Sequence, residues 1–158
     1  MYRHRITIRA KKGVTMSYRR GSIVALMLTT FLWSGCAELQ SMGGTNALMS
    51  LLSQQLGLTT NQATGGTGSV LSLAKEKLPS GDFSSLSKLI PGSDSLMQSA
   101  KDLGAVTGPV KDKAGLEAAF SRLGMGNEMV PKFLQIMSDF VGKTGGESAK
   151  NLLAMVMQ

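Results

Sequence analysis

A short apolar run near the N-terminus divides this chain and sets how much of it can build a core. The run covers residues 23–33, eleven residues that are apolar except for two threonines, and Arg19 and Arg20 precede it. A stable membrane-spanning helix needs about 20 apolar residues, so this run is too short. A positive start, a short apolar run and a small-residue end are the layout of a cleaved export signal. We therefore expect residues 1–35 to be removed, which leaves 123 residues to fold.

The end of the run carries the candidate modification site. Ser34, Gly35 and Cys36 close it, and this ending resembles the signal of bacterial lipoproteins, although Trp33 stands where that pattern prefers leucine. The resemblance implies that Cys36 carries fatty acyl groups such as palmitate on its sulfur and becomes the new N-terminus. Ala37, where an aspartate would favour the inner membrane, implies the periplasmic face of the outer membrane. The alternatives are ordinary signal cleavage with an unmodified thiol, and an uncleaved anchor.

The positive charge of the chain belongs to the leader. Of the 17 Lys and Arg residues, seven lie in residues 1–35 together with no acid, so residues 36–158 carry ten basic and ten acidic residues. A neutral domain without a basic patch lacks the electrostatic footprint of a nucleic-acid-binding protein, and no nucleic-acid partner is expected. The basic residues ahead of the apolar run are read as targeting features, and Met16 is an alternative true start.

Composition favours helices for the rest of the chain. After the leader there are four phenylalanines and no Trp or Tyr, and β-branched residues are few and scattered. Leu, Ala, Val and Met must therefore build the core, which suits closely packed small helices better than a sheet. We predict an all-α fold, a small bundle of six to seven short helices in residues 47–158. Residues 36–46 contain Gly43 and Gly44 and are predicted to be a tether close to the lipid.

A glycine run in the second predicted helix is the most unusual local feature. The first helix is predicted at residues 47–56 and the second at residues 59–78, where Thr59 and Gln62 match a capping box. The run at residues 65–68, Gly-Gly-Thr-Gly, lies inside this second helix. Each interior glycine costs about 1 kcal/mol relative to alanine, which indicates a close helix crossing in return. The alternative is a phosphate-binding loop, but the run fits neither common glycine-rich phosphate motif.

The remaining helices are placed by caps and breakers. Asp82 and Ser93 are each predicted to cap a short helix, and residues 104–115 form the longest loop. Gly142 is predicted to end the helix that starts near Asn127.

Two further patterns concern the second half of the chain. Thr144 and Glu147 are predicted to form a second capping box, at the start of the last helix. Residues 53–58 resemble residues 120–125, which suggests two similar helical hairpins.

Several segments resemble one bacterial family. These are QLGLTTNQATGGTGSVLSLAKEKL (residues 55–78), DFSSLSKLIPGSDSL (residues 82–96), AFSRLGMGNEMVPKF (residues 119–133) and GGESAKNLLAMV (residues 145–156). They are similar to DUF2780, also called VcgC/VcgE, and the resemblance covers nearly all of residues 36–158. It implies a small, all-helical bacterial envelope protein without an assigned activity, so no functional residue can be carried over.

The catalytic inventory after the leader is sparse. His4 is the only histidine and lies in the leader, and Cys36 is the only thiol, so neither His-based catalysis nor a Cys or His metal site is expected. Five methionines lie in the second half of the chain: Met125, Met129, Met137, Met155 and Met157. We read this cluster as core packing, with soft-metal binding as the alternative.

These observations lead to a non-enzymatic expectation. We expect an envelope lipoprotein that acts as an interaction or structural module, without cofactor or metal. Its partners would be the membrane, through the lipid on Cys36, and an envelope protein. The alternative is a periplasmic carrier of a lipid or another small apolar ligand.

Overall fold

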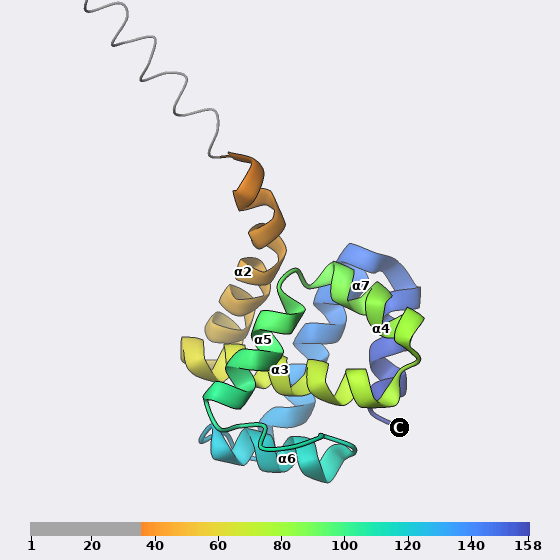
Figure 1. Cartoon of the computed structure of the whole chain (residues 1–158). Helices are drawn as coiled ribbons and strands as arrows, with labels where there is room; N and C mark the ends of the chain where they lie inside the picture. The colour runs from red at the N-terminus through yellow and green to blue at the C-terminus, as the bar shows by residue number, and fades with distance from the viewer. Residues whose placement is uncertain (1–35) are drawn as a thin grey trace, which may run out of the picture. The chain divides into compact units, whose positions relative to one another are not determined.

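Six helices and their short connections make up residues 36–158, the part of the chain that the computed structural model describes (Figure 1). They are α2 (Cys36–Leu56), α3 (Thr60–Lys77), α4 (Ser80–Leu89), α5 (Ser93–Asp102), α6 (Lys113–Arg122) and α7 (Met129–Val156). This part contains no strand, and the predicted all-α bundle is confirmed. The predicted leader and signal, residues 1–35, lie outside the described residues. By its internal contacts the chain divides into Met1–Leu39 and Gln40–Gln158, and the packing below concerns the second unit.

Helix α3 is the centre of the packing. It contacts α4, α5, α6 and α7, and its most extensive contact is with α5 (Figure 1). Ten of its residues are buried, including an unbroken run from Gly65 to Leu71. A helix that is buried on all sides must present small residues where neighbours approach closely, and the glycine run meets this need.

The capping box predicted at the start of α3 is present. The Gln62 backbone N–H donates to Thr59 Oγ1 at 3.3 Å, and the Thr59 backbone N–H donates to Gln62 Oε1 at 3.0 Å. Both bonds satisfy backbone donors that the first helical turn leaves without partners. The cap fixes where the central helix begins.

Replacing Thr59 with alanine is expected to lower the free energy of unfolding by about 1 kcal/mol, because one backbone donor loses its acceptor. Urea unfolding followed by circular dichroism measures this change. Thr60→Ala is the matched control, since Thr60 is exposed and is not the cap residue. Equal losses in both variants would contradict the capping role.

The glycine run lies at a close helix crossing, as predicted. A Cβ atom on Gly68 would collide with the carbonyl oxygen of Leu96 and lie 2.8 Å from the Cβ of Ala100. A Cβ on Gly66 would lie 2.8 Å from Cε2 of Phe133. The missing side chains therefore admit α5 on one side of α3 and α7 on another.

Two hydroxyl groups are buried in this crossing, and each of them forms a hydrogen bond. Thr67 Oγ1 donates to the Ala63 carbonyl at 2.8 Å, and Ser69 Oγ donates to the Gly65 carbonyl at 2.7 Å. Both carbonyls lie one turn earlier in the same helix, a common way to satisfy a buried Ser or Thr. Small polar residues can thus occupy the crossing without leaving a buried hydroxyl group unpaired.

The predicted tether differs from the structure. Residues 36–46 are helical and belong to α2, so this helix begins eleven residues earlier than the predicted start at Ala47. Packing explains part of the difference: the Thr45 hydroxyl donates to the Pro91 carbonyl, and a Cβ on Gly44 would sit 3.6 Å from Pro91 Cδ. This docking holds a glycine-containing stretch in the helix despite its low propensity.

Two predicted caps are also wrong. Pro79 occupies the cap position of α4, and Asp82 lies within the first turn. Gly92 occupies the cap position of α5, with φ of 78°, and Ser93 is the first helical residue. The Ser93 hydroxyl instead donates to the Ile90 carbonyl, which ties α5 to the end of α4.

The break in the last helix falls at Gly146 and not at Gly142. Helix α7 continues through Gly142, and Gly146 has φ of 72° and ψ of −169°. The predicted capping box of Thr144 and Glu147 is therefore wrong, and Thr144 Oγ1 donates to the Phe140 carbonyl at 3.0 Å. The backbone conformation of Gly146 is almost restricted to glycine, so it determines where the helix turns.

Replacing Gly146 with alanine is expected to cost about 2 kcal/mol of stability, because a Cβ strains this backbone although nothing lies within 4 Å of it. Thermal unfolding measures the loss. Gly142→Ala is the matched control: its Cβ would make ordinary contact with Lys150 at 3.6 Å, and helix propensity favours alanine. A stable Gly146→Ala variant would show that the kink is not obligatory.

Candidate functional site

A hollow lies between α3, α5 and the loop that follows α5. We call it the α3–α5 groove, and its volume is about 710 Å³. It is lined by three residues of α3, four of α5 and five of the loop: Ser72, Lys75, Glu76, Asp94, Met97, Gln98, Lys101, Val106, Thr107, Gly108, Pro109 and Val110. A site of this size is in the range of small-ligand and peptide pockets.

The two helical walls cross closely at Gly68. Because this residue has no side chain, the backbone of α3 lies against the Leu96 carbonyl of α5. Ser72 lies one turn after this contact, and its hydroxyl donates to the Gly68 carbonyl at 2.8 Å. The groove therefore starts from a rigid helix crossing.

The floor and the rim of the groove differ in chemistry. Met97, Val106 and Val110 are buried and form an apolar floor. The rim carries four exposed charged residues, two of each sign: Lys75, Lys101, Glu76 and Asp94. Among the side chains of residues 44–158 the one ion pair joins Lys113 to Glu117, so the rim charges are not paired with one another.

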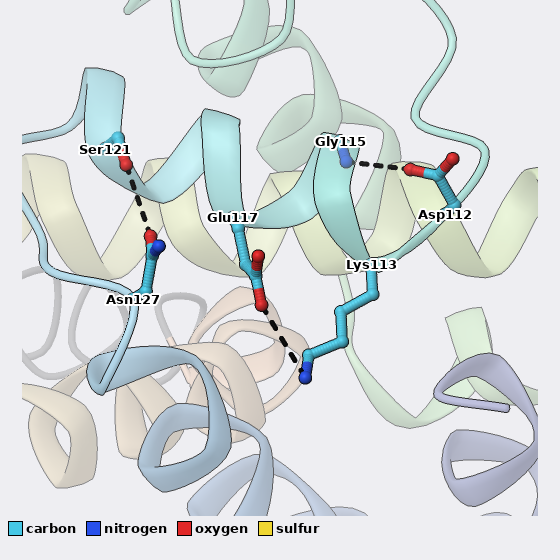
Figure 2. Close-up of polar contacts among 6 residues, drawn as sticks. All are labelled: Asp112, Lys113, Gly115, Glu117, Ser121 and Asn127. Atoms are coloured by element: carbon cyan, nitrogen blue, oxygen red, sulfur yellow. Dashed lines mark hydrogen bonds and ion pairs between the residues drawn. The ribbon is translucent and has the colours of Figure 1, made fainter.

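The loop wall is anchored at both ends. The Val106 N–H donates to the Ala100 carbonyl at 3.1 Å, and Arg122 Nη1 donates to the Ala105 carbonyl at 3.1 Å. At the other end Asp112 caps α6, where its Oδ1 accepts from the Gly115 N–H at 2.8 Å (Figure 2). These bonds hold the loop beside the helices.

Two further polar contacts involve α6 itself. Figure 2 shows the ion pair of Lys113 and Glu117, 3.6 Å between Nζ and Oε1, and the bond from Ser121 Oγ to Asn127 Oδ1 at 3.4 Å. Between the two anchors, the backbone groups of residues 107–111 form none of the hydrogen bonds found in the described residues. This stretch presents free donors and acceptors beside the groove.

Comparison with known proteins shows the family. Residues 35–158 match the family described as "Protein of unknown function VcgC/VcgE (DUF2780)". The chain belongs to the DUF2780 family. A search of the curated proteins and a search of the solved structures found no match.

The whole α3–α5 groove lies within the DUF2780 domain, and residues 1–34 lie outside the match. The match begins one residue before Cys36, at the boundary that the lipoprotein-type signal predicts. Cys36 is the first residue of α2, but its side chain lies outside the described residues. Attachment of a lipid to Cys36 therefore stays a prediction.

Other residues singled out in the sequence have clear places. Met125 and Met137 are buried in the core of the DUF2780 domain, and Met129 and Met157 are partly buried against it, which agrees with their interpretation as packing residues. For Met155 that interpretation is wrong, because its side chain is 46 % exposed. Among the side chains of residues 44–158, no three of His, Cys, Asp or Glu gather in a way that could hold a metal ion. Within residues 36–158, no helix has the length and hydrophobicity needed to cross a bilayer.

Sequence reasoning did not find the groove. Glu76 and Asp94 are both exposed, but their common place beside one hollow depends on how α3 and α5 cross. The available signal was the loop at residues 104–115, because a long loop next to a glycine-rich crossing leaves space beside the helices.

Proposed function

We propose that this DUF2780 protein is a non-enzymatic envelope lipoprotein whose domain is an interaction module. The α3–α5 groove carries the proposal: it has a rigid crossing, an apolar floor and a rim of exposed charges that have no partners among themselves. Such a combination suits recognition, in which the floor supplies affinity and the rim supplies specificity.

The proposed anchor is a lipid on Cys36. An apolar run and small residues precede Cys36, and both α2 and the family match begin there or one residue earlier. This arrangement would place the domain directly at a membrane surface, and Ala37 favours the periplasmic face of the outer membrane. The anchor would then hold the groove close to any ligand on the same membrane, which raises the effective concentration of that ligand.

The carrier of an apolar ligand has less support. The groove floor offers only a few apolar side chains, such as Met97 and Val110, and the rim around them is charged. A bound acyl chain would contact only these few apolar side chains and would make no polar contact with the rim. Recognition of a partner that has both apolar and charged groups uses the whole groove.

Replacing Cys36 with serine is expected to release the protein from the membrane fraction, because serine offers no thiol for acylation. Fractionation of cells followed by immunoblotting measures the distribution. Ser50→Ala, on the exposed side of α2, is the control and should stay in the membrane fraction. A Cys36→Ser variant that remains fully membrane-bound would contradict the lipid anchor.

The non-enzymatic part of the proposal has its own test. Purified protein should turn over no substrate in activity screens. Turnover that survives purification and disappears in a point variant of a groove residue such as Asp94 would overturn it.

A further inference from the structure

We infer that the α3–α5 groove binds an extended peptide segment of a partner protein, in which an apolar side chain lies between a basic and an acidic one. The inference rests on the proposed interaction function and specifies the chemistry of the partner. Three features of the groove carry it: the free backbone of the loop wall, the apolar floor and the charges of the rim.

The loop wall matches an extended backbone. Residues 107–111 have neither helical nor strand structure, and their N–H and C=O groups form no hydrogen bond within the described residues. An extended peptide carries donors and acceptors along its whole length and can pair with such a free edge. Pro109 has no N–H, so the donors of the residues that line the groove lie on either side of it, at Thr107, Gly108 and Val110.

The floor matches one apolar side chain of the peptide. Met97, Val106 and Val110 are 7 %, 5 % and 4 % exposed, so the contact area that they offer is small. Methionine adapts its shape to different partners, which allows several apolar residues at this place of the peptide. Extended peptides gain specificity from alternate side chains that enter such pockets.

The rim determines the charges of the peptide. A ligand of one charge sign would be attracted by two rim residues and repelled by the other two. A segment that carries both signs can place its acid beside Lys75 or Lys101 and its base beside Glu76 or Asp94. A lipid acyl chain has neither charges nor backbone groups to offer, so the observations favour a peptide.

A selection experiment tests the inference. The full chain in detergent micelles is immobilised, and a phage-displayed library of random seven-residue peptides is selected for binding. We expect enrichment of peptides with an apolar residue between one basic and one acidic residue. No enrichment over blank beads would overturn the inference.

Charge reversal then locates the binding site. Lys101→Glu should weaken binding of the selected peptides about tenfold, measured by fluorescence anisotropy, and exchanging the peptide acid for lysine should restore it. Lys132→Glu changes the net charge equally on α7, outside the groove, and should leave the affinity unchanged. Lys101 and Lys132 are both exposed, so the two variants should fold normally, which circular dichroism checks.

Two other outcomes would also contradict the inference about the groove ligand. Peptides that bind wild type and Lys101→Glu equally would overturn the inference, and so would a phospholipid that native mass spectrometry finds bound and that competes with the peptides. The peptide assay and the test of the lipid anchor are independent. If Cys36 is acylated but no peptide binds, the inference about the groove ligand is rejected and the proposal of a lipid-anchored protein is retained.

Discussion

Replacing Gly68 with alanine is expected to lower the free energy of unfolding by at least about 3 kcal/mol. The new Cβ would collide with the carbonyl oxygen of Leu96. It would also lie 2.6 Å from the carbonyl carbon of Leu96 and 2.8 Å from the Cβ of Ala100. Two of these three atoms belong to the backbone of α5, so no side chain can turn away and the helices must separate. Separation would also loosen the buried residues on both sides of the crossing.

Gly81→Ala is the matched control for this variant. Gly81 also lies in a helix, α4, but nothing lies within 4 Å of the position that its Cβ would occupy. Helix propensity therefore predicts an unchanged or slightly raised stability, by up to about 1 kcal/mol. Urea unfolding of both variants measures the difference. A Gly68→Ala variant as stable as Gly81→Ala would show that α3 and α5 do not cross as closely as described.

Replacing Phe133 with alanine is expected to cost about 3–5 kcal/mol of stability. Phe133 is fully buried on α7 and meets the ring of Phe120 edge-on, with centroids 5.1 Å apart and planes at 79°. It also covers the space that Gly66 leaves on α3. Three helices thus meet at one ring, and its removal would leave a cavity between them.

Phe83→Ala is the comparison variant, because Phe83 is only partly buried on α4. This substitution should lower the free energy of unfolding by less than about 2 kcal/mol.

A double-mutant experiment tests the contact between Phe133 and Gly66 directly. Gly66→Ala should destabilise wild type, where the Cβ would press on the Phe133 ring, but should do less harm once that ring is gone. Additive effects of the two substitutions would contradict the contact.

Local signals in the sequence predicted those features that depend on neighbours in the chain. The Thr59 and Gln62 capping box needs only residues three apart, and both bonds are present. The glycine run was correctly assigned to a close crossing, because several helix-breaking residues inside one helix need a packing reason. Gly57 and Gly124, which occupy the same position in the two similar segments, both have positive φ, at 67° and 72°.

Features that depend on distant contacts escaped prediction. Residues 36–46 read as a tether because glycine disfavours helix, but Gly44 packs against Pro91, which lies far along the sequence. Gly142 and Gly146 look alike in the sequence, and only the backbone conformation at Gly146 shows which one interrupts α7. The partner of the glycine crossing, α5, also could not be read from α3 alone.

The groove belongs to this second class. Lys75 and Glu76 of α3 come together with Asp94 and Lys101 of α5 only because Gly68 sets the crossing. Each residue by itself is an ordinary exposed charge. The candidate site is therefore a property of the packing, whereas the proposed anchor at Cys36 is a property of the local sequence.

The most direct test of the proposed lipoprotein is the intact mass of the protein extracted from its own membranes. The account predicts a chain that starts at Cys36, contains residues 36–158 and carries the added mass of fatty acyl groups. A chain that starts elsewhere and carries no acyl mass would contradict it, and Trp33 would then mark a signal that the lipoprotein pathway does not process.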